Sequence, residues 1–226
     1  MDPKQLAAQA ALAYLHSGMV VGLGTGSTAK LFIDALAAAL RSGTLRDIRT
    51  IPTSLRSEQQ ARELGIPIVT LAQCPLADIT VDGADEVDPP LDLIKGLGGA
   101  LLREKVVAQN SSRLLIVGDA SKKVAYLGQH VPLPVEVARF AHESHAAFLR
   151  GLGAEPILRL ADGHKPYVTD NGNFIYDCRF GRIDDARGLE SKLKTRAGII
   201  ESGLFVGLAS VVLLATDQAV ETLVRE

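Results

Sequence analysis

Aromatic residues and cysteines are scarce in this chain of 226 residues. Phe, Trp and Tyr make up 4% of the sequence, Trp is absent, and there are two cysteines. A protein that stacks nucleic-acid bases needs aromatic side chains, and Cys74 and Cys178 fit no metal-ligand or redox spacing. The sequence predicts an aliphatic core. Two buried free thiols in a reducing compartment are favoured over a disulfide, which the spacing leaves open.

Excess charge and long apolar runs are also lacking. The 24 Lys and Arg residues nearly balance the 26 Asp and Glu residues, which leaves a formal net charge of -2, so no general attraction to nucleic acid or to an anionic membrane is expected. No apolar run reaches the roughly 20 residues that cross a bilayer, and the polar N-terminus lacks the order of a secretory signal. These absences predict a soluble cytoplasmic protein without nucleic-acid or membrane partners.

Hydrophobic residues make up 47% of the chain, and over the first 130 residues they form short apolar runs that alternate with helical patterns. Near-continuous apolar strands that alternate with helices predict a parallel sheet covered by helices on both faces. The expected strands are residues 19–23, 48–52, 66–71, 77–81 and 113–118, and the expected helices are residues 27–41, 55–64 and 100–110.

The order of elements changes after the two prolines of residues 131–134, where an extended linker is expected. Asn171-Gly172 is a strong hairpin turn signal. Beyond the linker the order is βαββαβ, which is typical of a ferredoxin-like domain. The expected strands are residues 135–140, 155–160, 167–170 and 173–180 and a run starting at 199, and the expected helices are residues 142–151 and 189–196.

The last stretch, residues 204–226, is expected to contain a strand at residues 210–215 and a short amphipathic helix, and to return to the first domain. The fold prediction is therefore α/β, with two domains. A Rossmann-like parallel-sheet domain covers residues 1–130 plus 204–226, and a smaller ferredoxin-like α+β domain covers residues 131–203.

A glycine-rich segment, GLGTGST at residues 22–28, joins the first predicted strand to the following helix. Glycines allow a tight turn, and the N–H groups at a helix start bind phosphate well. Ser27 stands where a dinucleotide fingerprint has its third glycine, no acidic residue ends the second strand, and the Gly-Lys-Ser/Thr of a P-loop is absent. Phosphate binding is favoured over a purely structural turn.

Three carboxylates, Asp82, Asp85 and Glu86, follow the predicted strand at residues 77–81. Such crowding is costly unless the groups face water, a metal or a hydroxyl-rich ligand. Like charges also raise one another's pKa values, which suits proton transfer. On this pattern alone, a solvated acidic turn and a functional site are equally favoured.

A lysine and a glycine loop precede the predicted helix at residues 100–110. Lys95 can neutralise an oxyanion, and the glycines permit close backbone approach. Glu104 stands about one turn into the helix, where spacing alone slightly favours an ordinary carboxylate facing the helix dipole. Lys122, after the strand at residues 113–118, can bind an anion, although a surface lysine is favoured because such lysines are common.

His142 and His145 stand three apart on a predicted helix. Because no third ligand lies nearby in the sequence, a place on the helix surface is favoured over a metal site.

Together, these segments resemble ribose-5-phosphate isomerase of the A type. The motifs GLGTGSTAK, DITVDGADEV, LIKGLGGALLREK, IVGDASKK, LGQHVPLPVEV, VTDNGN and GLFVG occur in the order of that family across essentially the whole chain. The resemblance implies a fold similar to the one above. It also implies an enzyme that interconverts D-ribose 5-phosphate and D-ribulose 5-phosphate in the non-oxidative pentose phosphate pathway. A homodimer is expected as well, because the sheet of the ferredoxin-like domain offers an edge and a face to a partner subunit.

The resemblance implies roles for individual residues. Glu104 matches the catalytic glutamate that acts as general base, and Asp82, Asp85 and Lys95 match sugar-contacting and catalytic groups. The substrate-binding residues implied by the match are Thr25, Gly26, Ser27, Thr28, Gly83, Ala84, Gly96, Leu97, Gly98 and Lys122.

Two further positions bear on the match. Lys4 matches a lysine near the N-terminus that reaches the phosphate, although it lies outside the strong motifs. Leu97 departs from the all-glycine form KGGGG. Because a backbone N–H remains available there, altered loop packing with retained activity is expected.

An aldose–ketose isomerisation moves one proton between neighbouring carbons through an enediolate intermediate. Glu104 is expected to take the proton from C2 and return it to C1 while Lys95 stabilises the enediolate oxygen. Asp82 is expected to open the sugar ring, with Asp85 orienting hydroxyls, and residues 27–28 are expected to anchor the phosphate. This chemistry calls for neither a metal nor another cofactor.

Three other functions stay open at this stage. A sugar-phosphate sensor would keep the phosphate loop, but Glu104 with Lys95 and the lack of a preceding DNA-binding segment count against it. The imperfect glycine fingerprint counts against a nucleotide-dependent oxidoreductase. An acyl or CoA transferase with a nucleophilic glutamate would be recognised by a covalent glutamyl adduct.

Overall fold

The structure is a computed structural model that describes residues 2–161 and 164–225, and its chain divides into two compact units. The first unit consists of Met1–Ala84, Arg103–Lys123 and Leu208–Glu226, and the second of Asp85–Leu102 and Val124–Gly207. The segment 85–102 belongs to the second unit because β4 (Glu86–Val87) and β5 (Leu93–Ile94) form a three-stranded sheet with β11 (Leu204–Phe205). The division drawn from the sequence placed that segment in the first domain.

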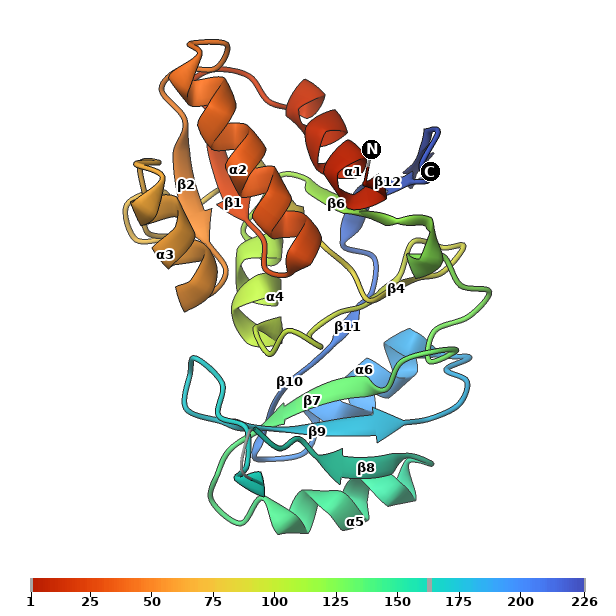
Figure 1. Cartoon of the computed structure of the whole chain (residues 1–226). Helices are drawn as coiled ribbons and strands as arrows, with labels where there is room; N and C mark the ends of the chain where they lie inside the picture. Colours follow the sequence, from red (N-terminus) through yellow and green to blue (C-terminus); the bar gives the residue numbers. More distant parts are fainter. Residues whose placement is uncertain (1, 162–163, 226) are drawn as a thin grey trace. The chain divides into compact units, whose positions relative to one another are not determined.

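The first unit is built on a six-stranded sheet with the order β13-β12-β6-β3-β1-β2. Every neighbouring pair is parallel except β12 and β13, which are antiparallel. Figure 1 labels β1, β2, β6 and β12 of this sheet. The strands are β1 (Val20–Leu23), β2 (Arg49–Pro52), β3 (Ile79–Asp82), β6 (Leu114–Asp119), β12 (Ala209–Ala215) and β13 (Val220–Val224). The helices are α1 (Pro3–Ala11), α2 (Ser27–Arg41), α3 (Leu55–Glu63) and α4 (Leu101–Gln109), with short 3-10 helices η1 (Leu12–Tyr14) and η2 (Ala120–Lys122).

Helices cover both faces of this sheet, as the continuous apolar strands predict. Val21 on β1 packs in a buried cluster with Ala8 of α1 and Phe32 of α2. Val20, the next residue along the chain, packs on the other face with Val107 of α4. Successive strand residues point to opposite faces, so a strand buried on both sides reads as an unbroken apolar run. The prediction of a covered parallel sheet is confirmed.

Two expectations for the first unit are wrong. Residues 66–71 form only an isolated bridge, Thr50 to Ile68, because Pro67 has no N–H to donate and the chain turns at Thr70, whose carbonyl accepts the Gln73 N–H. Residues 220–224 form strand β13 rather than a helix. A turn, in which the Thr216 hydroxyl accepts the N–H groups that follow it, brings the chain back along β12.

The second unit contains β7 (Leu133–Val137), α5 (Glu143–Gly151), β8 (Glu155–Leu158), β9 (Phe174–Arg179), α6 (Ala186–Lys194) and β10 (Ile199–Ser202). This is the predicted βαββαβ order. The four strands form an antiparallel sheet in the order β10-β7-β9-β8. Val135 and Tyr176 of this sheet form a buried cluster with Leu149 of α5 and Leu193 of α6. The predicted ferredoxin-like domain is confirmed.

Details of the second unit differ from the sequence expectation. Pro134 lies inside β7 rather than in a linker, because its fixed φ suits an extended chain and only a donor is lost. Residues 167–170 are not a strand, since β8 is the partner of β9. His145 is buried, with 3% of its surface exposed, and accepts a long hydrogen bond from Arg196 at 3.5 Å. The helix surface expected for it was therefore wrong.

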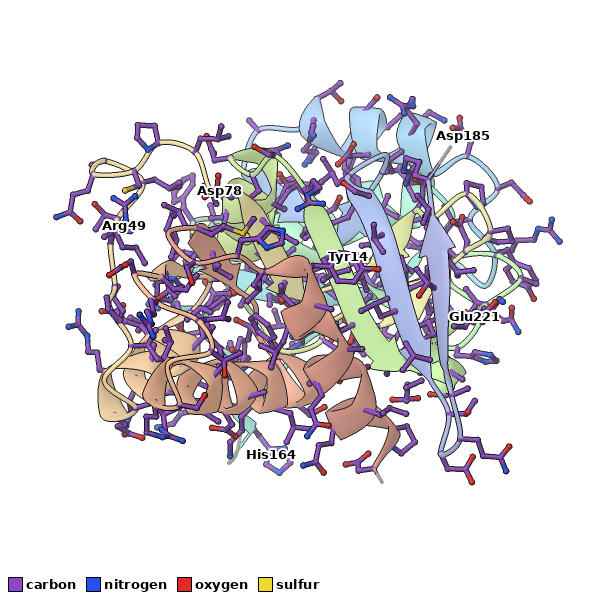
Figure 2. All side chains as sticks on the ribbon, turned by 90° about the horizontal axis from the view of Figure 1, so that it is seen from above. Tyr14, Arg49, Asp78, His164, Asp185 and Glu221 are labelled. Atoms are coloured by element: carbon purple, nitrogen blue, oxygen red, sulfur yellow. The ribbon has the colours of Figure 1, made fainter. Side chains whose placement is uncertain are left out.

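The amino end of the large sheet is held by structural contacts. Asp78 accepts the Val20 N–H at 2.7 Å, and Arg49 donates to the Cys74 sulfur at 3.2 Å; both charged residues are labelled in Figure 2. Over residues 2–161 and 164–225, none of the helices combines the length and the apolar character that a membrane crossing requires.

Candidate active site

The parallel strands of the first unit bring several predicted site residues to one edge of the sheet. β1 pairs with β3 through Leu23 and Val81, and β3 pairs with β6 through Val81 and Leu115. Because these strands run in the same direction, the segments that follow them lie at the same edge, where open α/β sheets bind ligands. Those segments are the glycine loop at residues 24–28, the turn after Asp82, and residues 119–122.

Asp82 anchors the glycine loop from the end of β3. Asp82 is 1% exposed, and its Oδ1 accepts the N–H of Thr25 at 3.0 Å and that of Gly83 at 2.7 Å. Gly24 allows this close approach, since a Cβ at residue 24 would stand 2.2 Å from the same oxygen. The sheet register and the absence of a side chain at residue 24 therefore set the position of the glycine loop relative to the Asp82 carboxylate.

Thr25 is held by two residues that the sequence analysis did not single out. Its hydroxyl lies 2.8 Å from that of Thr53 and donates to that of Ser54 at 2.8 Å. Both partners follow the carboxyl end of β2, and Ser54 also caps α3 together with Ser57. The one signal for them was their place directly after a strand. Since the N–H and the hydroxyl of Thr25 bind within the protein, this residue shapes the loop.

The start of α2 faces solvent and is close to an ammonium group. Gly26, at φ 117°, is the N-cap residue, and Ser27 is exposed at the first helical position. Nζ of Lys4 donates to Oγ of Ser27 at 3.2 Å. Thr28, one residue further, is buried. N–H groups at a helix start combined with a nearby ammonium group form a site suited to phosphate, and Lys4 belongs to it although its sequence match was weak.

Residues 119–122 add a second positive charge to this edge. Burial raises the pKa of Asp119, but hydrogen bonds from Ser121 and the positive charges of Lys122 and Lys4 outweigh burial, so the pKa lies below its ordinary value. Lys122 folds back over Gly118, where a Cβ would stand 3.2 Å from its Cγ. The positive charges of both lysines therefore act on the Asp119 carboxylate, and both lysines lie on the same edge as the glycine loop.

Glu104 lies near the amino end of α4, and the chain path shows at which end of the sheet that is. After α4, the carbonyl of Asn110 accepts the N–H of Ala77 at 2.8 Å, and Ala77 accepts from Ser112 at 2.9 Å. Ala77 precedes β3, so the carboxyl end of α4 lies at the amino edge of the sheet. The helix then runs antiparallel to the strands, and Glu104, 4% exposed, lies toward the edge that carries Asp82.

The predicted groups of the second unit form a loop of their own. Lys95 is 2% exposed; its N–H donates to the Gly203 carbonyl at 2.9 Å, and its Nζ lies 5.4 Å from the Phe205 ring centre. The Oδ2 atom of Asp85 accepts the N–H of Leu97 at 3.0 Å. Asp85, Lys95 and the residues that follow it are therefore tied together within this unit.

The loop needs glycine at two positions, and residue 97 is not one of them. Gly96 has φ 101° and Gly99 has φ 83°. Among the described residues, the non-glycine residues with positive φ are Asp47, Leu91, Ala141 and His164, so Leu97 adopts ordinary backbone angles. Leu97 is 39% exposed. The N–H expected to stay available at Leu97 donates to Asp85. Gly98 is exposed beside it.

The three carboxylates of the acidic segment have different environments. Glu86 is 1% exposed and accepts the N–H groups of Gly128, His130 and Val131 at 2.6, 2.6 and 3.0 Å. It therefore holds a loop of the second unit. Gly83 and Ala84, both partly exposed, end the first segment of the first unit.

The part of the chain that the structure describes contains no group of three or more His, Cys, Asp and Glu side chains able to hold a metal ion. Within the same residues, Cys74 and Cys178 are both free. Burial raises the pKa of the Cys178 thiol, which suppresses its thiolate form.

Comparison with known proteins extends over nearly the whole chain. Residues 49–219 match the family model for ribose 5-phosphate isomerase A, also called phosphoriboisomerase A. The ribose-5-phosphate isomerase A of Gloeobacter violaceus is 51% identical over 97% of this chain and 95% of its own length. That of Synechococcus sp. (strain JA-3-3Ab) is 48% identical over 97% of this chain and 96% of its own length.

Solved structures agree. A D-ribose-5-phosphate isomerase in complex with phospho-erythronic acid is 42% identical and superposes with a TM-score of 0.96, over 99% of this chain and 98% of its own. The ribose 5-phosphate isomerase A of Methanocaldococcus jannaschii is 41% identical, with a TM-score of 0.94 over 99% of this chain and 98% of its own.

The α/β fold, the phosphate-suited edge and these relatives define an enzyme of the isomerase class. The family model and the relatives that match over nearly their whole length have the same name. The chain belongs to the ribose 5-phosphate isomerase A family.

Proposed function

We propose that this chain interconverts D-ribose 5-phosphate and D-ribulose 5-phosphate through an enediolate, with Glu104 as the base. The observation that carries the proposal is the similar structure in complex with phospho-erythronic acid. The carboxylate of that acid, next to a carbon bearing a hydroxyl, has the planar shape and negative charge of an enediolate. Enzymes bind such analogues because they are complementary to the transition state.

The position of Glu104 supports its role as the base. It is nearly buried, near the amino end of α4, toward the sheet edge that carries Asp82 and the glycine loop. Little water surrounds a buried carboxylate, so little water competes with it for the substrate proton. In the proposed reaction, it removes the proton from C2 of the open-chain aldose and delivers it to C1, so one group serves both steps.

The phosphate of the substrate is proposed to bind at the start of α2. Ser27 presents an exposed hydroxyl there, Lys4 donates to it, and Lys122 lies on the same sheet edge. The helix dipole and two ammonium groups favour a dianion. Binding energy from the phosphate then aligns the reacting carbons, as remote contacts do in other enzymes.

The remaining roles are proposed from the family resemblance. Lys95 would stabilise the enediolate oxygen, and Asp82 would assist ring opening and move hydroxyl protons. Asp85 would orient hydroxyls. These steps only shift protons and charge, so the reaction is proposed to proceed without a metal or another cofactor.

The cellular setting is part of the same proposal. An enzyme with this substrate pair serves the non-oxidative pentose phosphate pathway, and we propose that it does so in the cytoplasm and as a homodimer. Sedimentation equilibrium on the purified chain tests the assembly. A mass that stays at 24.0 kDa across the concentration range would contradict the dimer.

The direct test is to mix the purified protein with ribose 5-phosphate and a chelator and follow ribulose 5-phosphate by NMR. Formation to equilibrium is expected. Activity that disappears with chelator and returns with a divalent ion would overturn the metal-free mechanism. Binding without turnover would indicate a sensor, and a covalent glutamyl adduct, detected by mass spectrometry, would indicate a transferase.

A further inference from the structure

The loop after Lys95 is held by a side chain from a distant part of the second unit. Arg159 follows β8, and its backbone is fixed on both sides: its N–H donates to the Ile175 carbonyl at 2.8 Å, and its carbonyl accepts the Tyr167 N–H at 2.9 Å. Its guanidinium lies 5.7 Å from the Tyr167 ring centre. The backbone from which the Arg159 side chain extends is therefore held in place.

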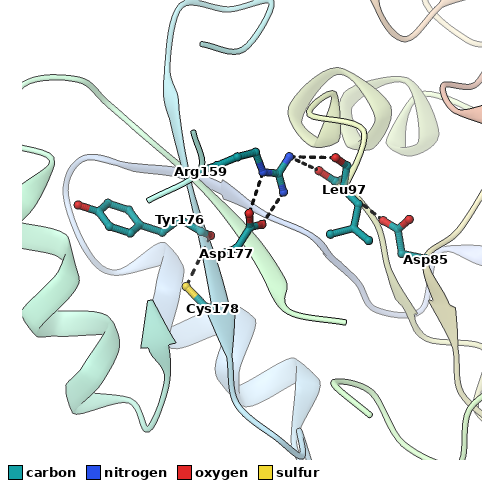
Figure 3. A network of polar contacts seen from close by, with 7 residues as sticks. Asp85, Leu97, Arg159, Tyr176, Asp177 and Cys178 are labelled. Carbon is teal, nitrogen blue, oxygen red and sulfur yellow. Dashed lines mark hydrogen bonds and ion pairs between the residues drawn. The ribbon is translucent and has the colours of Figure 1, made fainter. Parts of the chain in front are cut away.

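The guanidinium of Arg159 binds on two sides at once (Figure 3). Toward β9 it pairs with Asp177, with Nε donating to Oδ2 at 2.9 Å and Nη2 donating to Oδ1. Toward the loop, Nη1 donates to the carbonyls of Gly96 at 3.1 Å and Leu97 at 3.0 Å. The Arg159 and Asp177 side chains are 12% and 23% exposed. Only a planar fork with several donors makes this set of bonds, so lysine is not equivalent here.

One peptide group links Arg159 to Asp85. The carbonyl of Gly96 and the N–H of Leu97 belong to the same planar unit. Arg159 binds the oxygen of this unit, and Oδ2 of Asp85 accepts its N–H at 3.0 Å. Fixing the carbonyl therefore fixes the direction of the N–H, and a charged donor at the oxygen also polarises the N–H toward the carboxylate.

The same contacts hold the rest of the loop. The Gly96 carbonyl also accepts the Gly99 N–H at 2.9 Å, and a Cβ at Gly99 would stand 2.1 Å from the Tyr167 hydroxyl. The two residues that hold the loop, Arg159 and Tyr167, lie on neighbouring segments bonded to each other. The loop after Lys95 thus packs against Arg159 and Tyr167, and Asp177 holds Arg159 in place.

We infer that Arg159, oriented by Asp177, is a positioning residue: it fixes the Gly96–Leu97 peptide and through it the carboxylate of Asp85 and the loop after Lys95. The inference rests on the proposed function, because the importance of Asp85 and Lys95 comes from it. Arg159 acts through the peptide and is not assigned any contact with substrate.

The test compares Arg159→Ala and Arg159→Lys with Arg182→Ala. Arg182 pairs with Asp184 on the surface of the same unit, with 62% of its side chain exposed. A displaced catalytic group lowers turnover by as much as about 100-fold, so kcat is expected to fall 10- to 100-fold in both Arg159 variants, with KM within about threefold of the parent. Arg182→Ala is expected to match the parent.

Two readouts separate positioning from simple stabilisation. Guanidinium ion, added well below the concentration that unfolds the protein, is expected to restore part of the kcat of Arg159→Ala, whereas urea is not. In an Asp85→Asn background, Arg159→Ala is expected to lower kcat much less than in the parent, because residues that act through one another are not additive.

A third readout does not depend on catalysis. Hydrogen exchange of the Leu97 amide, followed by NMR, is expected to be faster in both Arg159 variants and unchanged in Arg182→Ala. If Arg159→Ala does not fold, kcat, hydrogen exchange and the double variant with Asp85→Asn are measured with Arg159→Lys alone.

The outcomes separate the two proposals. If the parent protein forms no ribulose 5-phosphate, the proposed function fails, and Leu97 exchange still decides whether Arg159 holds the peptide. An active parent with folded Arg159 variants of normal kcat overturns the inference alone. The inference is also overturned if the kcat losses of Arg159→Ala and Asp85→Asn multiply in the double variant. It is overturned as well if hydrogen exchange of the Leu97 amide is the same in the Arg159 variants as in the parent.

Discussion

The sheet edge of the first unit and the Lys95 loop of the second unit both hold a carboxylate, but by different means. Asp82 ends a strand of the parallel sheet and accepts N–H groups from a loop whose shape follows from the strands. Asp85 accepts an N–H from a peptide whose position depends on Arg159, a side chain far along the chain. The first geometry follows from backbone pairing, and the second from a single side-chain network.

This difference predicts where each region is sensitive. The sheet edge should not tolerate added atoms where its backbones touch. The loop after Lys95 should tolerate a change in the side chain of Leu97 but not the loss of Arg159. The following predictions test that contrast, from the largest effect to the smallest.

The largest effect is expected at Glu104. Glu104→Gln removes the proposed base and little volume, and loss of a general base lowers rates by about 10²- to 10⁴-fold. Turnover should fall by that factor, more than in any Arg159 variant, and the unfolding temperature should stay near that of the parent. Glu155→Gln, an exposed carboxylate on β8, is the matched control. Near-normal turnover in Glu104→Gln would remove Glu104 from the mechanism.

Two glycines test the backbone contacts of the sheet edge: Gly24, which approaches Asp82 in space, and Gly83, which follows it in the chain. A Cβ at residue 24 would stand 2.2 Å from Oδ1 of Asp82, whereas the nearest atom to a Cβ at Gly83 is 3.8 Å away. Gly24→Ala should lower the free energy of unfolding by about 1–3 kcal/mol, and Gly83→Ala should change it by less than about 0.5 kcal/mol. Urea denaturation measures both, and equal effects would show that the close approach of Gly24 to Asp82 does not matter for stability.

The two units should also differ in their response to pH. Burial lowers the pKa of His145 below its ordinary 6.5, with further contributions from Arg196 and His142, whereas His16 in the first unit is exposed. Because the unfolded chain takes up a proton that the folded one does not, the His145 contribution is complete above pH 6.5 and is lost as the pH falls toward its folded pKa.

His145→Gln should therefore flatten the fall in unfolding free energy as the pH drops from about 7 to 5, and His16→Gln, at an exposed position, is the control. Denaturant titrations at several pH values give the slope. An unaltered slope in His145→Gln would show that other groups cause the pH dependence.

The smallest effect is expected at Leu97, because its backbone, not its side chain, makes the loop contacts. Leu97→Ala should change the unfolding free energy by less than about 0.5 kcal/mol and leave kcat at the level of the parent. Leu55→Ala is the matched control, because Leu55 lies in the first unit and is 53% exposed. A clear loss of kcat would show that the side chain itself has a role in the loop.

Periodicity predicted most of the fold, because both domains are built from strands and helices with clear apolar patterns. It failed where the local pattern was ambiguous. Residues 220–224 became a strand because β12 offered a free edge, and residues 66–71 formed only one bridge. The prolines of residues 131–134 predict a break in the chain, but Pro134 lies inside β7, because a strand accepts a proline where its donor is not needed.

The candidate site was predictable only where a motif lay within one segment. The glycine loop, the acidic turn and the Lys95 loop follow strands or precede helices, and the sequence shows this directly. Thr53 and Ser54 carried only the signal of their place after β2, and Arg159 carried none. A contact between Arg159 and Gly96 depends on how β8 and β9 pack within the second unit, and one sequence does not record such packing.

The pairing of β6 with β12 has a consequence for synthesis. β6 ends at Asp119, and its parallel partner β12 begins at Ala209, so a ribosome makes most of the second unit before this pair can form. Until then, β6 is an open edge with apolar faces, a form prone to join other chains. Rapid folding of the second unit, or a chaperone that covers β6, would shorten the time for which this edge is exposed.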